Sequence, residues 1–103
     1  MSTSVEFVEY VCEQIGVGRN VRYRKMFGDY TVYVNDKPLL LVCDDVAYVK
    51  ILPQLSGIMS KAGKGVPYDG AKEHYILDID DRESVNSVVE ILEEVTPLPR
   101  KRK

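Results

Sequence analysis

Two stretches of the chain repeat apolar residues every three or four positions, which is the spacing of one face of an α-helix. In the first stretch these residues are Val5, Val8, Val11, Cys12 and Ile15. In the second stretch they are Val85, Val88, Val89, Leu92 and Val95. Thr3 with Glu6, and Asp80 with Glu83, stand in capping-box spacing ahead of the two stretches. The pattern predicts one helix over residues 3–15 and a second helix from about residue 80 to the Thr96-Pro97 stop.

Between these helices, β-branched and aromatic residues gather in short runs that are typical of strands. The predicted strands cover residues 20–26, 30–34, 39–43, 46–51 and 74–79. Asn35–Pro38 and Asp44-Asp45 predict turns, because Asn and Asp tolerate left-handed backbone geometry and Pro cannot extend a ladder. Pro53 starts a short predicted helix that runs to about Ala62, and residues 63–70 are a loop by composition. The order α-β-β-β-β-α-β-α predicts an α+β fold with helices packed on a mostly antiparallel sheet of about five strands.

The length and composition agree with one domain. The chain has 103 residues, 45% of them apolar, with seven tyrosines and two phenylalanines to fill one core. We expect residues 1–97 to form the domain and residues 98–103 to be a basic, disordered tail. The sequence shows no secretory signal and no apolar run near the ~20 residues of a membrane span, so we expect a cytoplasmic protein without membrane contact.

Charged residues are unevenly distributed, although sixteen acidic and fourteen basic side chains leave a net charge of only −2. From Glu73 to Glu94 there are eight acidic residues, and Arg82 is the single basic residue in that segment. The cations gather in two groups, which form the candidate interaction surface: Arg19, Arg22, Arg24 and Lys25, then Arg100, Lys101, Arg102 and Lys103. These groups could contact the phosphates of a nucleic acid. Alternatively, the cations are solvated or pair with the acidic second helix.

No pattern in the sequence points to a catalytic or metal site. His74 is the only histidine, and Cys12 and Cys43 both stand at apolar positions, where a thiol behaves as a small hydrophobic group. The stretch 57–65 departs from phosphate-loop spacing, and the aspartates at 78–81 lack the spacing of a calcium loop. We therefore expect no catalytic residue, no metal and no cofactor. An enzyme that acts through His74 and a carboxylate is the remaining alternative.

The run Arg24–Tyr33 (RKMFGDYTVY) resembles a known signature. It is similar to the Arg-x-Met-Phe-Gly-Gly-Tyr-Gly-x-Tyr motif of the TfoX N-terminal domain family, which is named for bacterial competence regulators. Asp29 and Thr31 depart from that motif. Residues 46–50 (VAYVK) are similar to the Leu-Tyr-x-Lys strand of the family. The positions that carry the resemblance are Met26, Phe27, Gly28, Tyr30, Tyr33, Tyr48 and Lys50.

The resemblance spans about residues 4–95 and implies a non-catalytic α+β domain that acts in transcriptional regulation of competence-type genes with a protein partner. In physical terms, Gly28 permits a sharp turn, and Met26 and Phe27 place one apolar group on each face of the sheet. The charged strand 20–25 suits a protected sheet edge, so we expect a monomer or a weak homodimer. Direct nucleic-acid contact through residues 19–25 and the basic tail stays open as an alternative.

Overall fold

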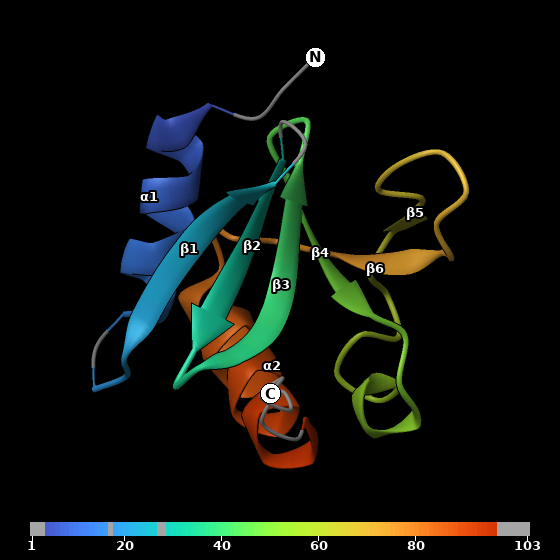
Figure 1. Ribbon diagram of the computed structural model, residues 1–103. Coiled ribbons are helices and arrows are strands. Elements are labelled where there is room, and N and C mark those ends of the chain that lie inside the picture. Colours follow the sequence, from blue (N-terminus) through green and yellow to red (C-terminus); the bar gives the residue numbers. More distant parts are fainter. Residues whose placement is uncertain (1–3, 17, 27–28, 97–103) are drawn as a thin grey trace, which may run out of the picture.

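The computed structural model describes residues 4–16, 18–26 and 29–96, and it confirms the predicted α+β fold. Two α-helices, α1 (Val5–Ile15) and α2 (Arg82–Val95), pack on one six-stranded antiparallel sheet (Figure 1). Its strands are β1 (Val21–Met26), β2 (Asp29–Val34), β3 (Lys37–Cys43), β4 (Val46–Lys50), β5 (Lys64–Gly65) and β6 (His74–Leu77). The order across the sheet is β1-β2-β3-β4-β6-β5, so the charged strand β1 is an edge, as expected.

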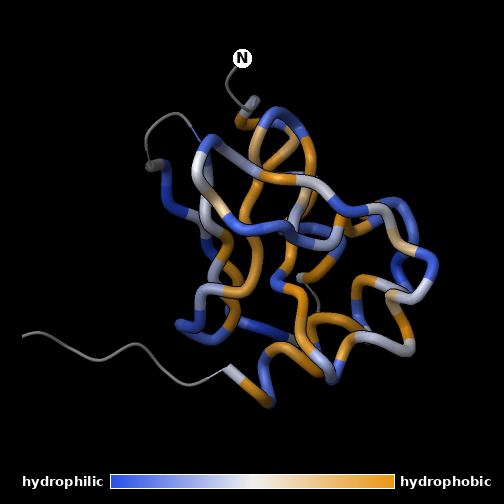
Figure 2. Tube along the Cα trace, turned by 90° about the vertical axis from the view of Figure 1, so that its right-hand side faces the viewer, coloured by the Kyte–Doolittle hydropathy of each residue, from blue (hydrophilic) through white to orange (hydrophobic). Residues whose placement is uncertain are grey.

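Both helices lie against the same face of the sheet, behind it in the view of Figure 1. Strand β2 shows the alternation that this arrangement requires: Tyr30, Val32 and Val34 are buried, whereas Thr31 and Tyr33 are only half-buried. The helices contribute the predicted apolar stripes to the same core, through Val8, Val11, Ile15, Val85, Val88, Val89 and Leu92. Figure 2 shows that much of the trace inside the molecule is apolar and that several of its outer turns are polar. In the part of the chain that the structure describes, no helix is long and apolar enough to cross a membrane.

Two-residue turns close the hairpins β2-β3 and β3-β4; the turn predicted at Asp44-Asp45 is confirmed, and the turn predicted at Asn35–Pro38 is confirmed only at Asn35-Asp36. Asn35, Asp36, Asp44 and Asp45 have φ angles of 51°, 69°, 54° and 58°. A pair of left-handed residues gives a type I′ turn, whose twist matches that of the flanking strands. Asn and Asp adopt this geometry at lower cost than other residues with side chains.

Pro38 lies inside β3, although the sequence pattern assigned it to a turn. It pairs with Tyr33, and the register shifts between Val32 and Tyr33. Because proline has no amide hydrogen to donate, an irregular point in the ladder accommodates it better than a regular one. The turn therefore shrinks to Asn35-Asp36, and the strand begins at Lys37.

The predicted helix from Pro53 to Ala62 is wrong in its extent. Only Pro53–Leu55 forms a 3₁₀-helix, η1, and turns follow it. Leu55 and Met59 are both buried, and the amide of Met59 donates to the Leu55 carbonyl at 2.8 Å. One helical turn is therefore enough to place both side chains in the core. The predicted loop at 63–70 contains the short strand β5, which pairs with β6.

The helix caps lie one residue later than the capping-box spacing predicts. The Ser4 hydroxyl accepts from the Phe7 amide at 3.3 Å, whereas Thr3 lies outside the described residues. At α2, the Asp81 carboxylate accepts from the Ser84 amide at 3.2 Å. In each case the neighbouring residue has equivalent chemistry, so spacing alone could not choose between them. Strand β6 likewise ends at Leu77, earlier than predicted.

Candidate interaction surfaces

Arg19, the first of the predicted surface cations, joins the two helices. Its side chain is only 16% exposed. The guanidinium donates to the Ile15 carbonyl at 3.2 Å and to Oδ1 of Asn86 at 2.7 Å, and it lies 4.0 Å from the Glu90 carboxylate. These contacts tie the end of α1 to the middle of α2. Arg19 is therefore placed to stabilise the fold rather than to meet a partner.

The three cations of β1 lie on different faces of the sheet. Arg22 and Arg24 pair with Tyr33 and Thr31 and so share the face that no described helix covers, which we call the open face. Lys25 pairs with the buried Tyr30 and points to the helix side. The remaining predicted cations, residues 100–103, lie outside the described residues.

Ion pairing separates the two arginines of the open face. The Arg22 guanidinium is 3.3 Å from the Asp36 carboxylate and 4.7 Å from the centre of the Tyr33 ring. Arg24 is exposed and makes no ion pair among the described residues, and the same holds for Lys25. The four cations of residues 19–25 therefore do not form one surface. Arg19 lies between the helices, Arg22 and Arg24 lie on the open face, and Lys25 lies on the helix side of the sheet.

The residues of the signature motif divide between the core and the open face. Tyr30 is buried and packs edge-to-face on Tyr23, with 5.5 Å between ring centres. Tyr33 and Tyr48 lie on the open face, and Lys50 ends β4 opposite His74. The side chain of Met26 and all of residues 27–28 lie outside the described part, so the predicted roles of Met26, Phe27 and Gly28 remain predictions.

The two thiols and the histidine of the chain lie in different surroundings. Burial raises the pKa of Cys43 to about 12 and that of Cys12 to about 11. Nδ1 of His74 lies 2.7 Å from the Lys72 carbonyl, and the ring packs edge-on to Tyr48. Across residues 4–16, 18–26 and 29–96, no group of three His, Cys, Asp or Glu side chains is placed to hold a metal ion.

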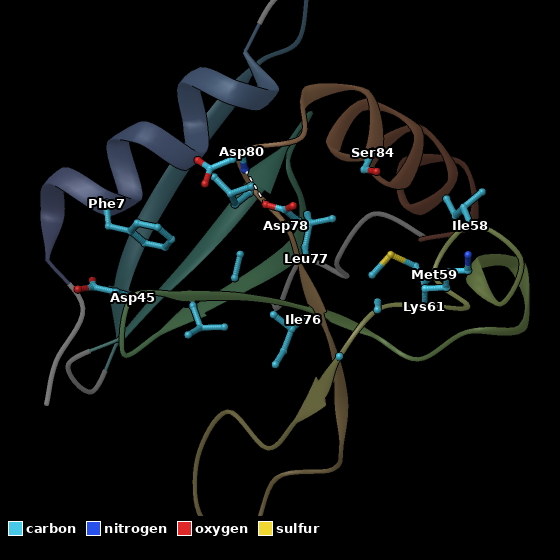
Figure 3. A pocket seen from close by; sticks show the side chains of 15 residues that line it. Phe7, Asp45, Ile58, Met59, Lys61, Ile76, Leu77, Asp78, Asp80 and Ser84 are labelled. Carbon is cyan, nitrogen blue, oxygen red and sulfur yellow. Dashed lines mark hydrogen bonds between the residues drawn. The ribbon is translucent and has the colours of Figure 1, made fainter.

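A groove of about 640 Å³ runs along the junction of α1, β4, β6 and α2 (Figure 3). In that view Phe7 and Asp45 lie at one end, Ile58 and Lys61 lie at the other, and Asp78 and Asp80 lie between them. The apolar lining residues are Phe7, Val46, Ala47, Ile58, Met59, Ala62, Ile76, Leu77 and Ile79. Three carboxylates line it as well, from Asp45, Asp78 and Asp80, together with the single cation Lys61.

Hydrogen bonds fix the groove carboxylates in position. Oδ1 of Asp45 accepts from the Ser4 amide at 2.9 Å, which anchors the start of α1. Oδ1 of Asp78 accepts from the Asp80 amide at 3.1 Å. Asp80 in turn accepts from the Tyr10 hydroxyl, and this hydrogen bond raises the pKa of Tyr10. The groove therefore presents a preformed acidic rim over an apolar floor, although sequence spacing assigned Asp80 only to a helix cap.

Comparison of the sequence with known proteins finds a similar protein but assigns the chain to no family. No family model matches the chain, and no solved structure matches it. The chain is 27% identical over 105 residues to a protein of Spirochaeta aurantia described as an "Uncharacterized 12.7 kDa protein in trpE 5' region". The alignment covers all of this chain and 91% of that protein. The two proteins are thus similar along nearly their whole lengths.

Proposed function

We propose that this protein is a non-catalytic interaction domain of the TfoX N-terminal type that acts in transcriptional regulation in the cytoplasm. Its groove binds a segment of a protein partner in which apolar and basic side chains alternate. The observation that carries the proposal is the groove itself, with its apolar floor and its rim of Asp45, Asp78 and Asp80. A volume of about 640 Å³ is within the range of binding sites for small ligands and short peptide segments.

Charge and apolar surface act together in such a groove. Apolar partner residues would cover the half-exposed Ile58 and the neighbouring floor. Basic partner residues would meet the carboxylate rim, which favours the correct partner and discriminates against acidic segments. The carboxylates need little reordering on binding, because hydrogen bonds from the protein already hold them.

The absence of activated groups supports a binding role rather than catalysis. Both thiols have raised pKa values, so neither is a ready nucleophile at neutral pH. The Ser84 hydroxyl, which borders the groove, donates to the Asp81 carboxylate at 2.9 Å as part of the α2 cap. Among the described residues, no hydrogen bond joins His74 to a carboxylate.

Two isoleucines allow a matched test. Ile58 lines the groove and is 50% exposed, whereas Ile51 is 40% exposed and lies outside it. Fluorescence anisotropy would measure the binding of a labelled peptide of alternating lysine and leucine to the intact protein and to the variants Ile58→Ser and Ile51→Ser. Covering the exposed half of an isoleucine is worth about 1 kcal/mol. Ile58→Ser should therefore weaken binding about fivefold.

Ile51→Ser should leave the affinity unchanged, and a peptide of alternating glutamate and leucine should bind more weakly than the lysine peptide. Equal effects of the two serine variants would refute the groove as the binding site. Equal affinity for the two peptides would refute the role of the acidic rim. We also expect a monomer or weak homodimer, which light scattering would check.

A further inference from the structure

The open face of the sheet has a regular arrangement of side chains across five strands. The pairing register aligns Arg24, Thr31, Leu41, Tyr48 and Ile76 in one row from β1 to β6. Because paired residues in antiparallel strands point to the same side, these side chains share the open face. Several of these side chains are polar or aromatic. A sheet face covered by another layer of the protein would carry apolar side chains at those positions.

Two tyrosines on this face contact neighbouring side chains. The Arg22 guanidinium lies over one face of the Tyr33 ring, 4.7 Å from the ring centre, so a base would stack on the opposite face. The Tyr48 ring contacts His74 edge-on at 6.4 Å between centres. A Cβ atom at Gly65 would lie only 3.3 Å from Tyr48, so the glycine lets β5 approach the ring closely. Rings that are fixed before binding lose little entropy when a ligand stacks on them.

A shallow hollow of about 310 Å³ lies between the two tyrosines. Its lining residues are Thr31, Tyr33, Pro38, Leu39, Leu40, Leu41, Tyr48, Lys50 and His74. Tyr33 is on β2 and Tyr48 is on β4, with one strand between them, and Tyr48 is in register with Thr31, two residues along β2 from Tyr33; the two tyrosines therefore stand about 12 Å apart. The hollow therefore has an apolar floor, aromatic walls and a cation at its edge.

Among the described residues, the open face carries more basic than acidic side chains. Its cations are Arg22, Arg24 and Lys50, and Asp29 shares the side of Thr31 and Tyr33 along β2. Arg22 is paired with Asp36 of the β2-β3 turn. Arg24 and Lys50 are exposed and make no ion pair within the described ranges. The acidic residues of the groove lie elsewhere, at the ends of strands and the start of α2. A flat aromatic ligand that carries negative charge is thus the chemistry that this face fits.

We propose that the open face binds single-stranded nucleic acid, with bases stacked on Tyr33 and Tyr48 and the backbone phosphates near Arg24 and Lys50. A single strand exposes the faces of its bases, whereas a duplex hides them, so ring stacking selects the single strand. Arg19 and Lys25 take no part, because they lie away from this face. The inference does not depend on the groove or on the partner proposed for it.

Adjacent cations on one strand give the sharpest test. The assay is fluorescence anisotropy with a labelled oligothymidylate of about twelve nucleotides, at salt concentrations from about 50 to about 200 mM. Arg24→Gln should reduce the slope of log affinity against log salt by about 0.7, the value for one phosphate contact of a single strand. Lys25→Gln should leave the slope unchanged. Both variants keep residues 100–103, so a contribution of the basic tail cancels in the comparison.

Ring stacking is tested with leucine, which keeps apolar surface on the sheet. Tyr33→Leu and Tyr48→Leu should each weaken binding about tenfold, whereas Tyr68→Leu, at a ring that is 54% exposed in a loop, should not. Circular dichroism would establish that each variant folds.

Each of the following binding results would overturn the proposal: no binding at about 50 mM salt, equal effects of Arg24→Gln and Lys25→Gln, equal affinity for duplex DNA or heparin, and unchanged binding by both leucine variants. A homodimer that Tyr33→Leu abolishes would also overturn it, since the face would then belong to a second copy.

Discussion

The bridging role of Arg19 gives a stability prediction that separates it from the other cations. Arg19→Met keeps most of the aliphatic stem and removes the guanidinium, and with it the hydrogen bonds to Ile15 and Asn86. Hydrogen bonds from a charged donor contribute about 1.5–3 kcal/mol each. Glu90 adds little, because its side chain is 81% exposed and the pair is 4.0 Å apart. Since water can replace part of the donation to Asn86, we expect a loss of about 2 kcal/mol in the free energy of unfolding.

Urea denaturation followed by circular dichroism would measure this loss. For a domain of this size, about 2 kcal/mol moves the unfolding midpoint down by about 1–2 M urea. Arg24→Met is the matched control, because Arg24 is exposed and has no ion pair among the described residues. It should change stability by no more than about 0.5 kcal/mol. If Arg19→Met proved as stable as Arg24→Met, the contacts of Arg19 with the two helices would contribute nothing to the free energy of unfolding, and our reasoning would be wrong.

Three further predictions concern single groups. With its pKa raised to about 12, the native Cys43 thiol should react with a disulfide reagent at pH 8 about 1,000-fold more slowly than in urea, as measured by mass spectrometry; equal rates would contradict its burial. Asp36→Gly should raise the melting temperature by about 4 °C because glycine adopts a positive φ freely, whereas Asp45→Gly should not, since its carboxylate anchors α1; scanning fluorimetry would compare them. Hydrogen bonds from Ser84 lower the pKa of Asp81, so the Asp81 carboxyl takes up its proton at a higher pH in the unfolded chain than in the folded one. The stabilisation of the fold by the Asp81 carboxylate is therefore present above about pH 4 and is lost as the pH falls through the lowered pKa. An Asp81→Asn variant whose acid unfolding curve matched the parent's would contradict this.

Periodicity was a reliable guide wherever a long amphipathic stretch meets the core. The stripe of α2 predicted four residues that are at most 2% exposed, at Val85, Val88, Val89 and Leu92. The end of that stripe is less buried, because Val95 is 36% exposed at the last turn. Turn chemistry was equally informative, since two Asn or Asp residues in succession marked both hairpins.

Short or irregular segments were harder to predict, because their conformation depends on contacts elsewhere in the chain. Nothing in the sequence Lys64-Gly65 indicates a strand, because its pairing depends on β6; a side chain at Gly65 would also lie close to the Tyr48 ring. Pro38 could join a strand only because the register of β3 is irregular at that point. Two residues are too few to carry a periodic signal.

For the candidate sites too, features that depend on neighbouring residues in the sequence could be predicted, whereas features that depend on residues far apart in the sequence could not. Alternation along β1 could have separated Arg24 from Lys25, since neighbouring residues in a strand face opposite ways. The groove could not be found in this way, because its lining residues come from segments as far apart as Phe7 and Ser84. For Arg19 the alternative of pairing with the second helix is the one that the structure shows, and the sequence could not choose it because Asn86 and Glu90 are 67 residues or more away.

The connections of the sheet have a consequence for the order in which the molecule assembles. Strands β2, β3 and β4 are joined by two-residue turns, so their pairing requires almost no loop closure and can proceed on the microsecond scale of isolated hairpins. Docking of β6 must instead close the segment 51–73, and the contact of Gln14 with the Ile79 carbonyl spans 65 residues. The three central strands should therefore form the folding nucleus, and the groove, which needs α1, β6 and α2 together, should be among the last features to appear.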